Sequence, residues 1–484
     1  MLETVKTTAQ RLAIGPLGQR LAARQRRRTD VPLARWGLEV SPRGALARAG
    51  VDLVELVASY GSPLHVVWAD ALDANAAEAL APLSGAGPAC DVFYSYKTNP
   101  VPGVLRRLHA AGIGAEVISP YELWLALRLR VPPERIIYNG PAKSFESLCD
   151  AVHAGVGLIN ANSLGDLDLI GRAAERAGRI ATVGVRVTLP SMWGGQFGLV
   201  AASPAPAEAV RLAQRHAWLH LRGLHVHRGS GLRCRADMED HVNGVLAFCD
   251  RLRTETGWHP EVIDLGGSLT TATVAPIPAR QYRLNRALAT DLLPPDPADH
   301  LSVGQASRLA AALVEAHSFA RDLTAPAVVL EPGRALTGDA QLLLTTVHDV
   351  KEDGALAHAV LDAGVNIAEP ATGEYHQIFS ATAPTAPVGR SYRLVGPICT
   401  PADVICNNWR LPDLAPGHVL ALMDSGAYFV PFSTSFSFPR PAIVLQDGAE
   451  VRLLRRAETF DDLVRADLME GSGPNGPGGL SGFP

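Results

Sequence analysis

The chain has 484 residues, 47% of them hydrophobic and 19% charged, with a formal net charge of -4 and an isoelectric point near 6.4. This composition excludes a disordered or fibrous protein, and the balanced charge gives no indication of nucleic-acid binding. Six cysteines without CxxC pairing, and no apolar run of about 18 residues, argue against a disulfide scaffold and a membrane span. We therefore expect a two-domain cytoplasmic protein that binds neither nucleic acid nor membrane.

The N-terminal end of the chain is basic. Its first thirty residues contain seven lysines and arginines, namely Lys6, Arg11, Arg20, Arg24, Arg26, Arg27 and Arg28. We interpret residues 1–35 as a solvated, partly helical extension, although such a segment could also touch a membrane surface or an acidic partner. Residues 36–62 are expected to supply a strand and a helix to the second domain.

Between Cys90 and Arg334 the sequence alternates short apolar, β-branched runs with longer stretches of helical period, which is typical of repeated βα units, and we expect this domain to span residues 63–335. Eight such runs occur, at 91–96, 114–119, 135–140, 157–163, 181–188, 221–227, 261–267 and 325–333. Eight parallel strands close a barrel, so we predict an α/β fold with a (β/α)8 TIM-type barrel. The Pro-rich stretch 270–302 is interpreted as an irregular excursion on the barrel rim.

Beyond residue 335 the pattern changes to strand-like runs without regular helices, at 341–350, 359–362, 391–395, 418–423, 442–445 and 450–454. Such runs predict a mostly antiparallel β-domain over residues 336–465. The last segment, 466–484, is rich in Gly and Pro and has little to bury, so we expect it to be disordered.

Polar residues end the predicted barrel strands, at the edge where barrels of this kind place their active sites. They are Lys97, Glu116, His227 with Ser230, Gly266 with Gly267, and Glu331 with Arg334. Taken singly these signals are weak, since a lysine after a strand is usually a surface residue and a Gly-Gly pair is usually a turn. The pair His225 and His227 has no third ligand at the spacing of a zinc site, so no metal is expected.

Taken together, these residues meet the needs of one kind of cofactor. A buried lysine amine can form a Schiff base with an aldehyde. Backbone NH groups of a Gly-Gly turn, a serine hydroxyl and an arginine can bind a phosphate. An imidazole can stack on an aromatic ring, and a carboxylate opposite a pyridine nitrogen keeps that nitrogen protonated.

The motifs resemble those of the fold-type III pyridoxal 5'-phosphate (PLP) dependent decarboxylases, the family of diaminopimelate and ornithine decarboxylases, from about Leu53 to about Leu445. The resemblance implies an alanine racemase-like barrel with PLP as its cofactor. It implies that Lys97 is the Schiff-base lysine, that His227 stacks on the ring and that Glu331 pairs with the pyridine nitrogen. It further implies that Glu116 lies near the lysine and that the phosphate is held by Ser230, Gly266, Gly267 and Arg334, with Tyr428 of SGAYF close by.

The segment GPICTPADVI resembles the family's Gly-Pro-x-Cys motif, whose cysteine reaches across a dimer interface and helps to return a proton to the substrate carbon. Here that cysteine is Cys399, and Asp403 matches an aspartate that follows it. The resemblance therefore implies a homodimer with shared active sites. Without the motif, Cys399 would be interpreted as a small buried hydrophobic residue.

Glu331 favours decarboxylation over racemisation. Racemases of this fold type place an arginine at the pyridine nitrogen, whereas a carboxylate keeps the ring protonated and able to absorb the electrons of the lost CO2. The expected enzyme is therefore a PLP-dependent amino-acid carboxy-lyase. A racemase or lyase on the same scaffold, and a non-catalytic regulatory homologue, are the alternatives.

Departures from the family cluster where the substrate is recognised. Thr400 replaces the acid that binds a distal amine, and the stretch EPATGEYH gives Glu369 and Gly373 where diaminopimelate decarboxylases carry Arg and Tyr. A carboxylate at Glu369 would repel a distal carboxylate, although Glu369 could equally receive a cation or hydroxyl or face solvent. We therefore expect Glu369, Thr400 and Asp403 to meet a substrate unlike diaminopimelate or ornithine. An amino acid or conjugate of siderophore- or antibiotic-type metabolism fits this expectation.

Overall fold

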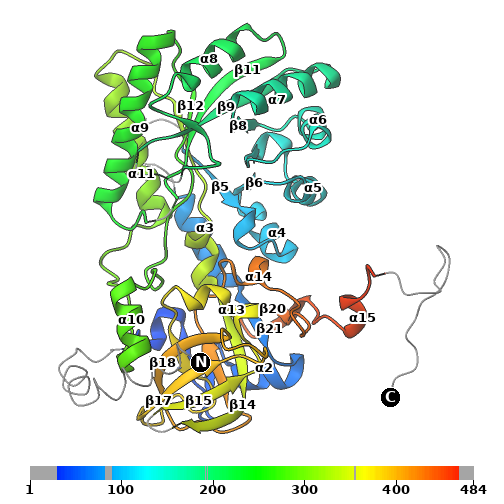
Figure 1. Cartoon of the computed structure of the whole chain (residues 1–484), viewed down its shortest axis with the longest axis vertical. Coiled ribbons are helices and arrows are strands. Elements are labelled where there is room, and N and C mark those ends of the chain that lie inside the picture. The colour runs from blue at the N-terminus through cyan, green and yellow to red at the C-terminus, as the bar shows by residue number, and fades with distance from the viewer. Residues whose placement is uncertain are drawn as a thin grey trace, which may run out of the picture.

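The computed structural model describes residues 30–467, except 82–89, 191, 193, 230, 354 and 355. Figure 1 shows two parts, a barrel in the upper half and a β-domain in the lower half. The predicted basic extension up to residue 29, Ser230 and the predicted tail from residue 468 lie outside the described residues. Among the described helices, none combines the length and the apolar character that crossing a bilayer requires.

Eight parallel strands of the described chain form the barrel, and they fall on the eight runs predicted from the sequence. They are β5 (Cys90–Ser95), β6 (Gly114–Val117), β7 (Ile136–Tyr138), β8 (Leu158–Ala161), β9 (Ala181–Thr188), β11 (Leu219–Val226), β12 (Val262–Asp264) and β13 (Ala327–Leu330). They pair in the order β9-β11-β12-β13-β5-β6-β7-β8, and pairing of β8 with β9 closes the ring. Every residue of β6, β7 and β8 is buried, as expected of parallel strands covered on both faces. The predicted (β/α)8 barrel is confirmed.

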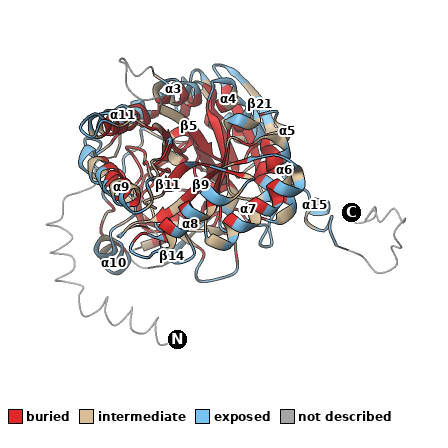
Figure 2. Ribbon diagram, turned by 90° about the horizontal axis from the view of Figure 1, so that it is seen from above, coloured by how far each residue is buried: buried red, intermediate tan, exposed pale blue. Residues whose placement is uncertain are grey.

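Helices form a ring outside these strands, and Figure 2 shows buried residues on the strands and exposed residues on the outer faces of the helices. The ring contains α3 (Ala69–Ala79), α4 (Pro102–Ala110), α5 (Pro120–Arg128), α6 (Phe145–Ala154), α7 (Leu164–Ala177), α8 (Ala205–Arg215), α9 (Arg235–Thr256) and α11 (Val303–Phe319). Serine side chains begin four of them, because the hydroxyls of Ser119, Ser144, Ser163 and Ser302 each accept the NH group three residues on.

The β-domain is built on a second sheet. Its strands are β4 (Leu64–Trp68), β14 (Gln341–Asp353), β15 (Leu356–Leu361), β16 (Ile378–Ser380), β17 (Arg390–Val395), β18 (Val404–Leu411), β19 (Val419–Leu422), β20 (Ala442–Asp447) and β21 (Glu450–Arg455). Most of the pairings are antiparallel, as predicted, while β15 with β17 and β4 with β20 pair in parallel. A small separate sheet precedes it, made of β1 (Leu38–Val40), β2 (Leu46–Arg48) and β3 (Val51–Asp52) and followed by α2 (Leu53–Tyr60).

The predicted start of the barrel at residue 63 is wrong by one strand. β4 pairs with β14 and β20 of the β-domain, and Leu64, Val66 and Trp68 belong to that domain's core. The barrel part begins only with α3. All five residues of β4 are buried, so the run carries no polar face that could have shown which sheet it joins.

The stretch 270–302, predicted to be an irregular excursion, includes one regular helix. It contains α10 (Ala279–Leu288), and Asn285 of this helix donates a hydrogen bond of 3.1 Å to the carbonyl of Asn408 on β18. Just before α10, Ile277 N donates to Gly373 O at 2.9 Å and Tyr375 N donates to Ala275 O at 2.8 Å. The insertion therefore leaves the barrel and pairs with a segment of the β-domain.

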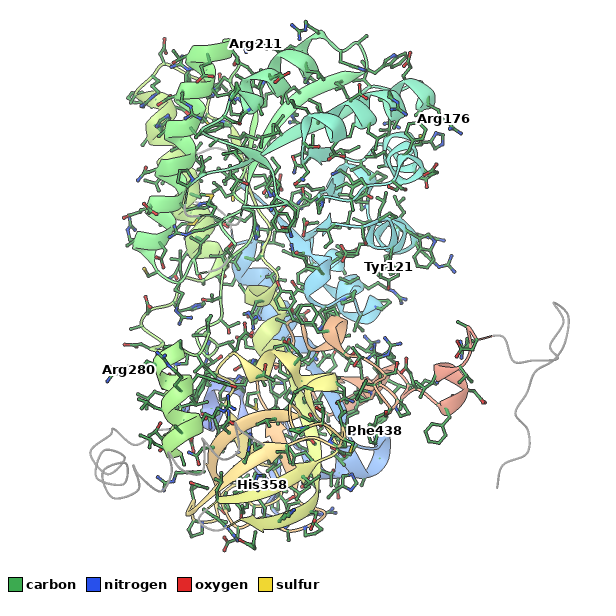
Figure 3. The ribbon with its side chains drawn as sticks, in the orientation of Figure 1. Tyr121, Arg176, Arg211, Arg280, His358 and Phe438 are labelled. Carbon is green, nitrogen blue, oxygen red and sulfur yellow. The ribbon has the colours of Figure 1, made fainter. Side chains whose placement is uncertain are left out.

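The carboxyl ends of the barrel strands meet the β-domain. Short helices line this junction: α12 (Arg334–Thr337), α13 (Val365–Ala368) and α14 (Phe429–Phe432), while α15 (Phe460–Leu463) follows β21. Tyr428 N, before α14, donates to Thr98 O after β5 at 2.9 Å. In Figure 3, Arg211 marks the barrel end away from the junction and His358 the far side of the β-domain. The polar strand ends are therefore enclosed between the two parts.

Candidate active site

Lys97 lies in a one-turn 3-10 helix (Tyr96–Thr98) directly after β5, at the junction of the two parts. The side chain is partly buried. Burial acts to lower the pKa of Lys97, but the nearby Glu116, Tyr428 and Glu331 outweigh this effect and raise the pKa above its ordinary value. The lysine therefore carries its proton next to two buried acids, in the place predicted for it.

Glu116 on β6 and Glu331 after β13 are the two acids whose charges raise the pKa of Lys97, and both are buried. Glu116 accepts hydrogen bonds from Ser95 Oγ at 2.6 Å and from Asn139 Nδ2 at 2.9 Å. The same Asn139 amide donates to Glu331 Oε1 at 2.6 Å. Burial raises the pKa of Glu116 in spite of the opposing effect of Lys97.

Glu331 stays ionised because its neighbours favour the anion. Burial acts to raise its pKa, but His225, whose Nε2 lies 3.6 Å from Glu331 Oε2, and a hydrogen bond with Asp264 bring the pKa well below the ordinary value. Asp264 is fully buried at the end of β12, and burial together with Glu331 raises its pKa strongly. Of these two adjacent acids, Asp264 therefore holds the proton and Glu331 the charge.

His227, which follows β11, is a neutral imidazole. Burial, and then the charge of Lys97, lower its pKa well below the ordinary value. Its Nδ1 accepts a hydrogen bond of 3.2 Å from Gly267 N. A Cβ atom at Gly266, whose φ is 68°, would lie 2.5 Å from that same Nδ1, so the close approach of the turn requires glycine there.

The Gly-Gly turn differs in detail from the predicted phosphate cradle. Gly266 N donates to Asp264 Oδ1 at 2.9 Å and Gly267 N donates to His227, so both NH groups have side-chain acceptors. The next residue, Ser268, has φ 74° and accepts Gly229 N at 3.0 Å through its hydroxyl. The turn holds the imidazole and Asp264, and its contact with a phosphate remains a prediction.

Arg334 begins α12, and its guanidinium provides an anion-binding group at the junction. Its Nη2 donates to Glu374 Oε1 at 2.7 Å, and the Tyr428 ring centroid lies 5.4 Å from its Cζ. Its Nη1 is buried and has no hydrogen-bond partner among the described residues. An orphaned buried cationic donor next to Tyr428 fits a phosphate group, so the residues present suit PLP.

Cys399 is exposed, so the interpretation as a buried hydrophobic residue does not hold. Asp403 behaves differently from prediction, because it is 3% exposed and therefore does not face a substrate. Its carboxylate accepts Ile398 N at 2.7 Å and Val365 N at 2.8 Å. The aspartate fixes the backbone next to Cys399, and that support explains the sequence motif.

Glu369 and Thr400, which were predicted to bind the substrate, and the neighbouring Gly373 are exposed in this single chain. Glu369 is exposed at the start of a 3-10 helix (Glu369–Thr372), Gly373 has open space at its Cβ position, and Thr400 is exposed. The carboxylate of this stretch that does enter the site is Glu374. Sequence reasoning missed it, although its position directly after Gly373 could have marked it.

Arg186 on β9 was also missed. Its guanidinium lies over the Phe197 ring at 4.7 Å, and burial lowers its pKa while Glu331 and Glu116 oppose that change. Its charge therefore belongs to the same buried cluster as the two acids. A charged residue inside the apolar run ATVGVRVT was the available signal.

Glu331 supplies a third potential metal ligand beside the pair His225 and His227. His225, His227 and Glu331 place one potential ligand atom each within 4.8 Å of one another, and the third of them comes from a distant strand. Strand spacing could not show that. The same three groups also match the imidazole and carboxylate that a PLP ring requires.

Comparisons with known proteins agree with the cofactor interpretation. Residues 74–338 match the family model described as pyridoxal-dependent decarboxylase, pyridoxal binding domain. A diaminopimelate decarboxylase from Methanothermobacter thermautotrophicus is 30% identical over 437 residues, covering 88% of this chain and 96% of that protein. One from Aquifex aeolicus is 29% identical, with coverages of 88% and 96%. The crystal structure of diaminopimelate decarboxylase from M. jannaschii superposes with a TM-score of 0.79 at 26% identity, covering 91% of this chain and 99% of that one.

Proposed function

Because this chain belongs to the pyridoxal-dependent decarboxylase family, we propose that it acts on an amino acid or amino-acid conjugate whose distal end is not a carboxylate. The chain is a PLP-dependent carboxy-lyase that acts on an amino acid. When bound, PLP supplies an electron sink for the pair of electrons left by departing CO2. The proposal concerns the substrate and the roles of the residues around it.

The chain's own groups divide the work between binding and proton handling. Lys97 provides the amine that carries the cofactor, and Arg334 with Tyr428 holds its phosphate. Glu331, kept anionic by His225 and by its hydrogen bond with Asp264, would pair with the pyridine nitrogen and keep it protonated. The neutral ring of His227 would stack on the cofactor ring, and Cys399 would return a proton to the substrate carbon.

One observation carries the substrate proposal. In the stretch EPATGEYH, Glu369 faces solvent, Gly373 has no side chain, and Glu374 is bound to Arg334. Glu369, Gly373 and Glu374 therefore offer no cation to a distal carboxylate. Burying that carboxylate beside Glu374 without a partner would cost several kcal/mol, roughly the penalty of an unpaired buried charge.

The exposed Cys399 supports a homodimer as the active unit, because a proton donor on the surface of one chain can complete the site of another. Three exposed aromatic residues follow Tyr428 closely in the sequence. Phe432 is 55% exposed, Phe436 is 58% exposed and Phe438 is 38% exposed. An apolar surface next to the cofactor residues is what such an interface requires.

Two broader assignments are also part of the proposal. The six cysteines are all unpaired, which suits a reducing, cytoplasmic compartment. The departures from the family motifs at Glu369, Gly373 and Thr400 suit specialised metabolism, of siderophore or antibiotic type, better than a standard amino-acid pathway.

A second candidate is diaminopimelate decarboxylation, which is favoured by the relatives at about 30% identity. The two are separated by measuring CO2 release from meso-diaminopimelate, lysine, ornithine, arginine and N-acylated or citryl-linked diamino acids. We expect the free dibasic and dicarboxylic amino acids to be inert and one conjugate to react. Turnover of diaminopimelate with kcat/KM of about 10⁴ M⁻¹ s⁻¹ or more, an ordinary enzymatic value, would establish the second candidate instead.

A further inference from the structure

An ion pair between Glu374 and Arg334 links the β-domain to the barrel at the cofactor site. The two atoms, Glu374 Oε1 and Arg334 Nη2, are 2.7 Å apart, and the two side chains are 24% and 12% exposed. Such short contacts between partly buried charged groups are among the stronger hydrogen bonds in proteins. Glu374 therefore lies next to a residue expected to bind the cofactor.

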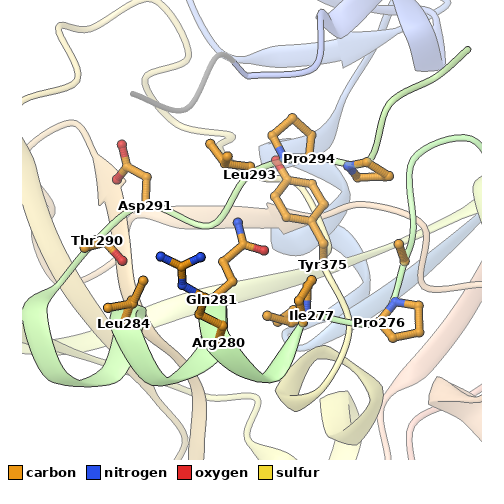
Figure 4. A pocket seen from close by; sticks show the side chains of 13 residues that line it. Pro276, Ile277, Arg280, Gln281, Leu284, Thr290, Asp291, Leu293, Pro294 and Tyr375 are labelled. Carbon is orange, nitrogen blue, oxygen red and sulfur yellow. The ribbon is translucent and has the colours of Figure 1, made fainter. Parts of the chain in front are cut away.

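The backbone on both sides of Glu374 is held in place. Gly373 O and Tyr375 N hydrogen-bond to Ile277 N and Ala275 O of the insertion. The Tyr375 hydroxyl donates to Gln377 Oε1 at 2.7 Å. Figure 4 shows Tyr375 opposite Gln281 of α10, across a cavity of about 480 Å³. Hydrogen bonds therefore hold the backbone on both sides of the carboxylate, and this segment lies outside the barrel that carries Arg334.

The charges around the pair fix its ionisation. Burial acts to raise the pKa of Glu374, but His376 and Arg334 outweigh it and the pKa falls below the ordinary value. His376 Nε2 lies 3.6 Å from Glu374 Oε2, and His376 Nδ1 lies 2.9 Å from Met423 O. Glu374 is thus an anion set between an imidazole and a guanidinium.

Arg334 keeps a free donor in spite of this pair. A guanidinium presents its donors in one rigid plane, so binding Glu374 through Nη2 fixes the direction of Nη1. That Nη1 is buried and has no partner among the described residues. With the Tyr428 ring near the guanidinium, the remaining donor can point in only a narrow range of directions.

We propose that Glu374 is a positioning residue for cofactor binding: it holds Arg334 so that Nη1 meets the phosphate of PLP. The energetic gain is preorganisation, because the arginine loses its side-chain freedom before the phosphate arrives. The stretch EPATGEYH, which in relatives would bind the distal end of the substrate, then contributes to cofactor binding instead. This inference depends on the cofactor and not on the identity of the substrate.

The main competing explanation is that Glu374 weakens, and does not strengthen, the binding of the PLP phosphate. A carboxylate beside the arginine could weaken phosphate binding by competing for it and by repelling the dianion. The two explanations predict opposite signs when Glu374 is changed. A purely structural role predicts equal losses for ligands with and without a phosphate.

The experiment titrates the full-length apoprotein with PLP and, separately, with pyridoxal, following the absorbance change on binding. Three variants change Glu374. Glu374→Gln keeps an acceptor oxygen, whereas Glu374→Ala and Glu374→Asp do not reach Arg334. The fourth variant is Glu369→Gln. The last removes an exposed carboxylate five positions earlier and is the matched control. Thermal melting of each variant reports whether it folds.

We expect Glu374→Ala and Glu374→Asp to weaken PLP binding at least about tenfold, as for the loss of one charged hydrogen bond. Pyridoxal binding should change less than about twofold, and Glu374→Gln should bind PLP within about threefold of wild type. If Glu374→Ala does not fold, Glu374→Asp and Glu374→Gln still give the comparison. Tighter PLP binding in these variants, or equal losses for PLP and pyridoxal, would overturn the proposal.

Discussion

Asn139, which follows β7, donates a hydrogen bond of 2.6 Å to Glu331, which follows β13, although β5 and β6 stand between these two strands. The same amide nitrogen donates to Glu116 at 2.9 Å, and its carbonyl oxygen accepts from Asn160 at 2.8 Å. One neutral side chain thus bridges two buried acids that would otherwise repel each other. The hydrogen-bonding needs of both acids are therefore met in part by this one side chain.

Replacing Asn139 should therefore damage both stability and cofactor chemistry. Asn139→Ala leaves two buried carboxyl groups short of a donor, so we expect the free energy of unfolding to fall by about 1–3 kcal/mol. Urea denaturation measures this change. Asn162→Ala is the control, since the side-chain amide of Asn162 bonds backbone groups of the rim, donating to Gln196 O and accepting from Gly198 N, and no buried acid. Equal losses in the two variants would contradict the bridging role.

Asp403 should control the cysteine next to it. Asp403→Ala removes the acceptor for Ile398 N and Val365 N, which frees the loop that carries Cys399. We expect the reaction rate of the exposed thiol with a disulfide reagent to change several-fold and CO2 release to fall about tenfold or more. The control is Asp413→Ala at an exposed position of the β-domain. If thiol reactivity and activity both stay at wild-type levels, the support role is wrong.

Much of this site could be predicted because the barrel's apolar runs end in polar residues. Lys97, His227 and Glu331 each follow such a run, so their common edge could be inferred from the chain alone. The roles of Asn139 and Asp264 were not predicted, because their partners lie on other strands and come close only when the barrel closes.

Orientation was the other quantity that the sequence did not reveal. Glu369 and Glu374 have the same chemistry and lie five residues apart, yet only Glu374 turns inward. Pairing of its segment with the insertion before α10 decides this, and that pairing joins residues about a hundred positions apart. A long-range contact of this kind leaves no local pattern.

The buried Glu122 should give a pH-dependent stability difference. Burial, and then Glu116, raise the pKa of Glu122 to about 7 from an ordinary value of 4.5. Between these values the folded protein keeps a proton that the unfolded chain releases, so wild-type stability falls as pH rises toward 7. Glu122→Gln lacks this titration. Its stability relative to wild type should rise by up to about 3 kcal/mol from pH 4.5 to pH 7.

Urea unfolding of both proteins across this range measures the difference. Glu134→Gln, at an exposed position, controls for the loss of one negative charge. A relative stability of Glu122→Gln that stays constant from pH 4.5 to pH 7 would show that Glu122 is ionised in the folded protein throughout.

Shared active sites should be detectable by complementation. If Cys399 of one chain serves Lys97 of the other, Lys97→Ala and Cys399→Ala are each inactive, but a mixed dimer contains one intact site. Random exchange of equal amounts should restore up to about a quarter of the wild-type sites. CO2 release from the mixture measures this recovery, and no recovery after confirmed subunit exchange would place both groups in one chain.

The most direct test of the account is to trap the cofactor on the protein. Borohydride reduction of the PLP-loaded protein, followed by peptide mapping, identifies the lysine that carries it. We expect the adduct on Lys97 and its loss in Lys97→Ala, because Lys143, the other lysine enclosed by the barrel, is bound to Asp166 at 2.7 Å and to Gly140 O at 2.7 Å. An adduct on Lys143, or no adduct at any lysine, would contradict the assignment of the site.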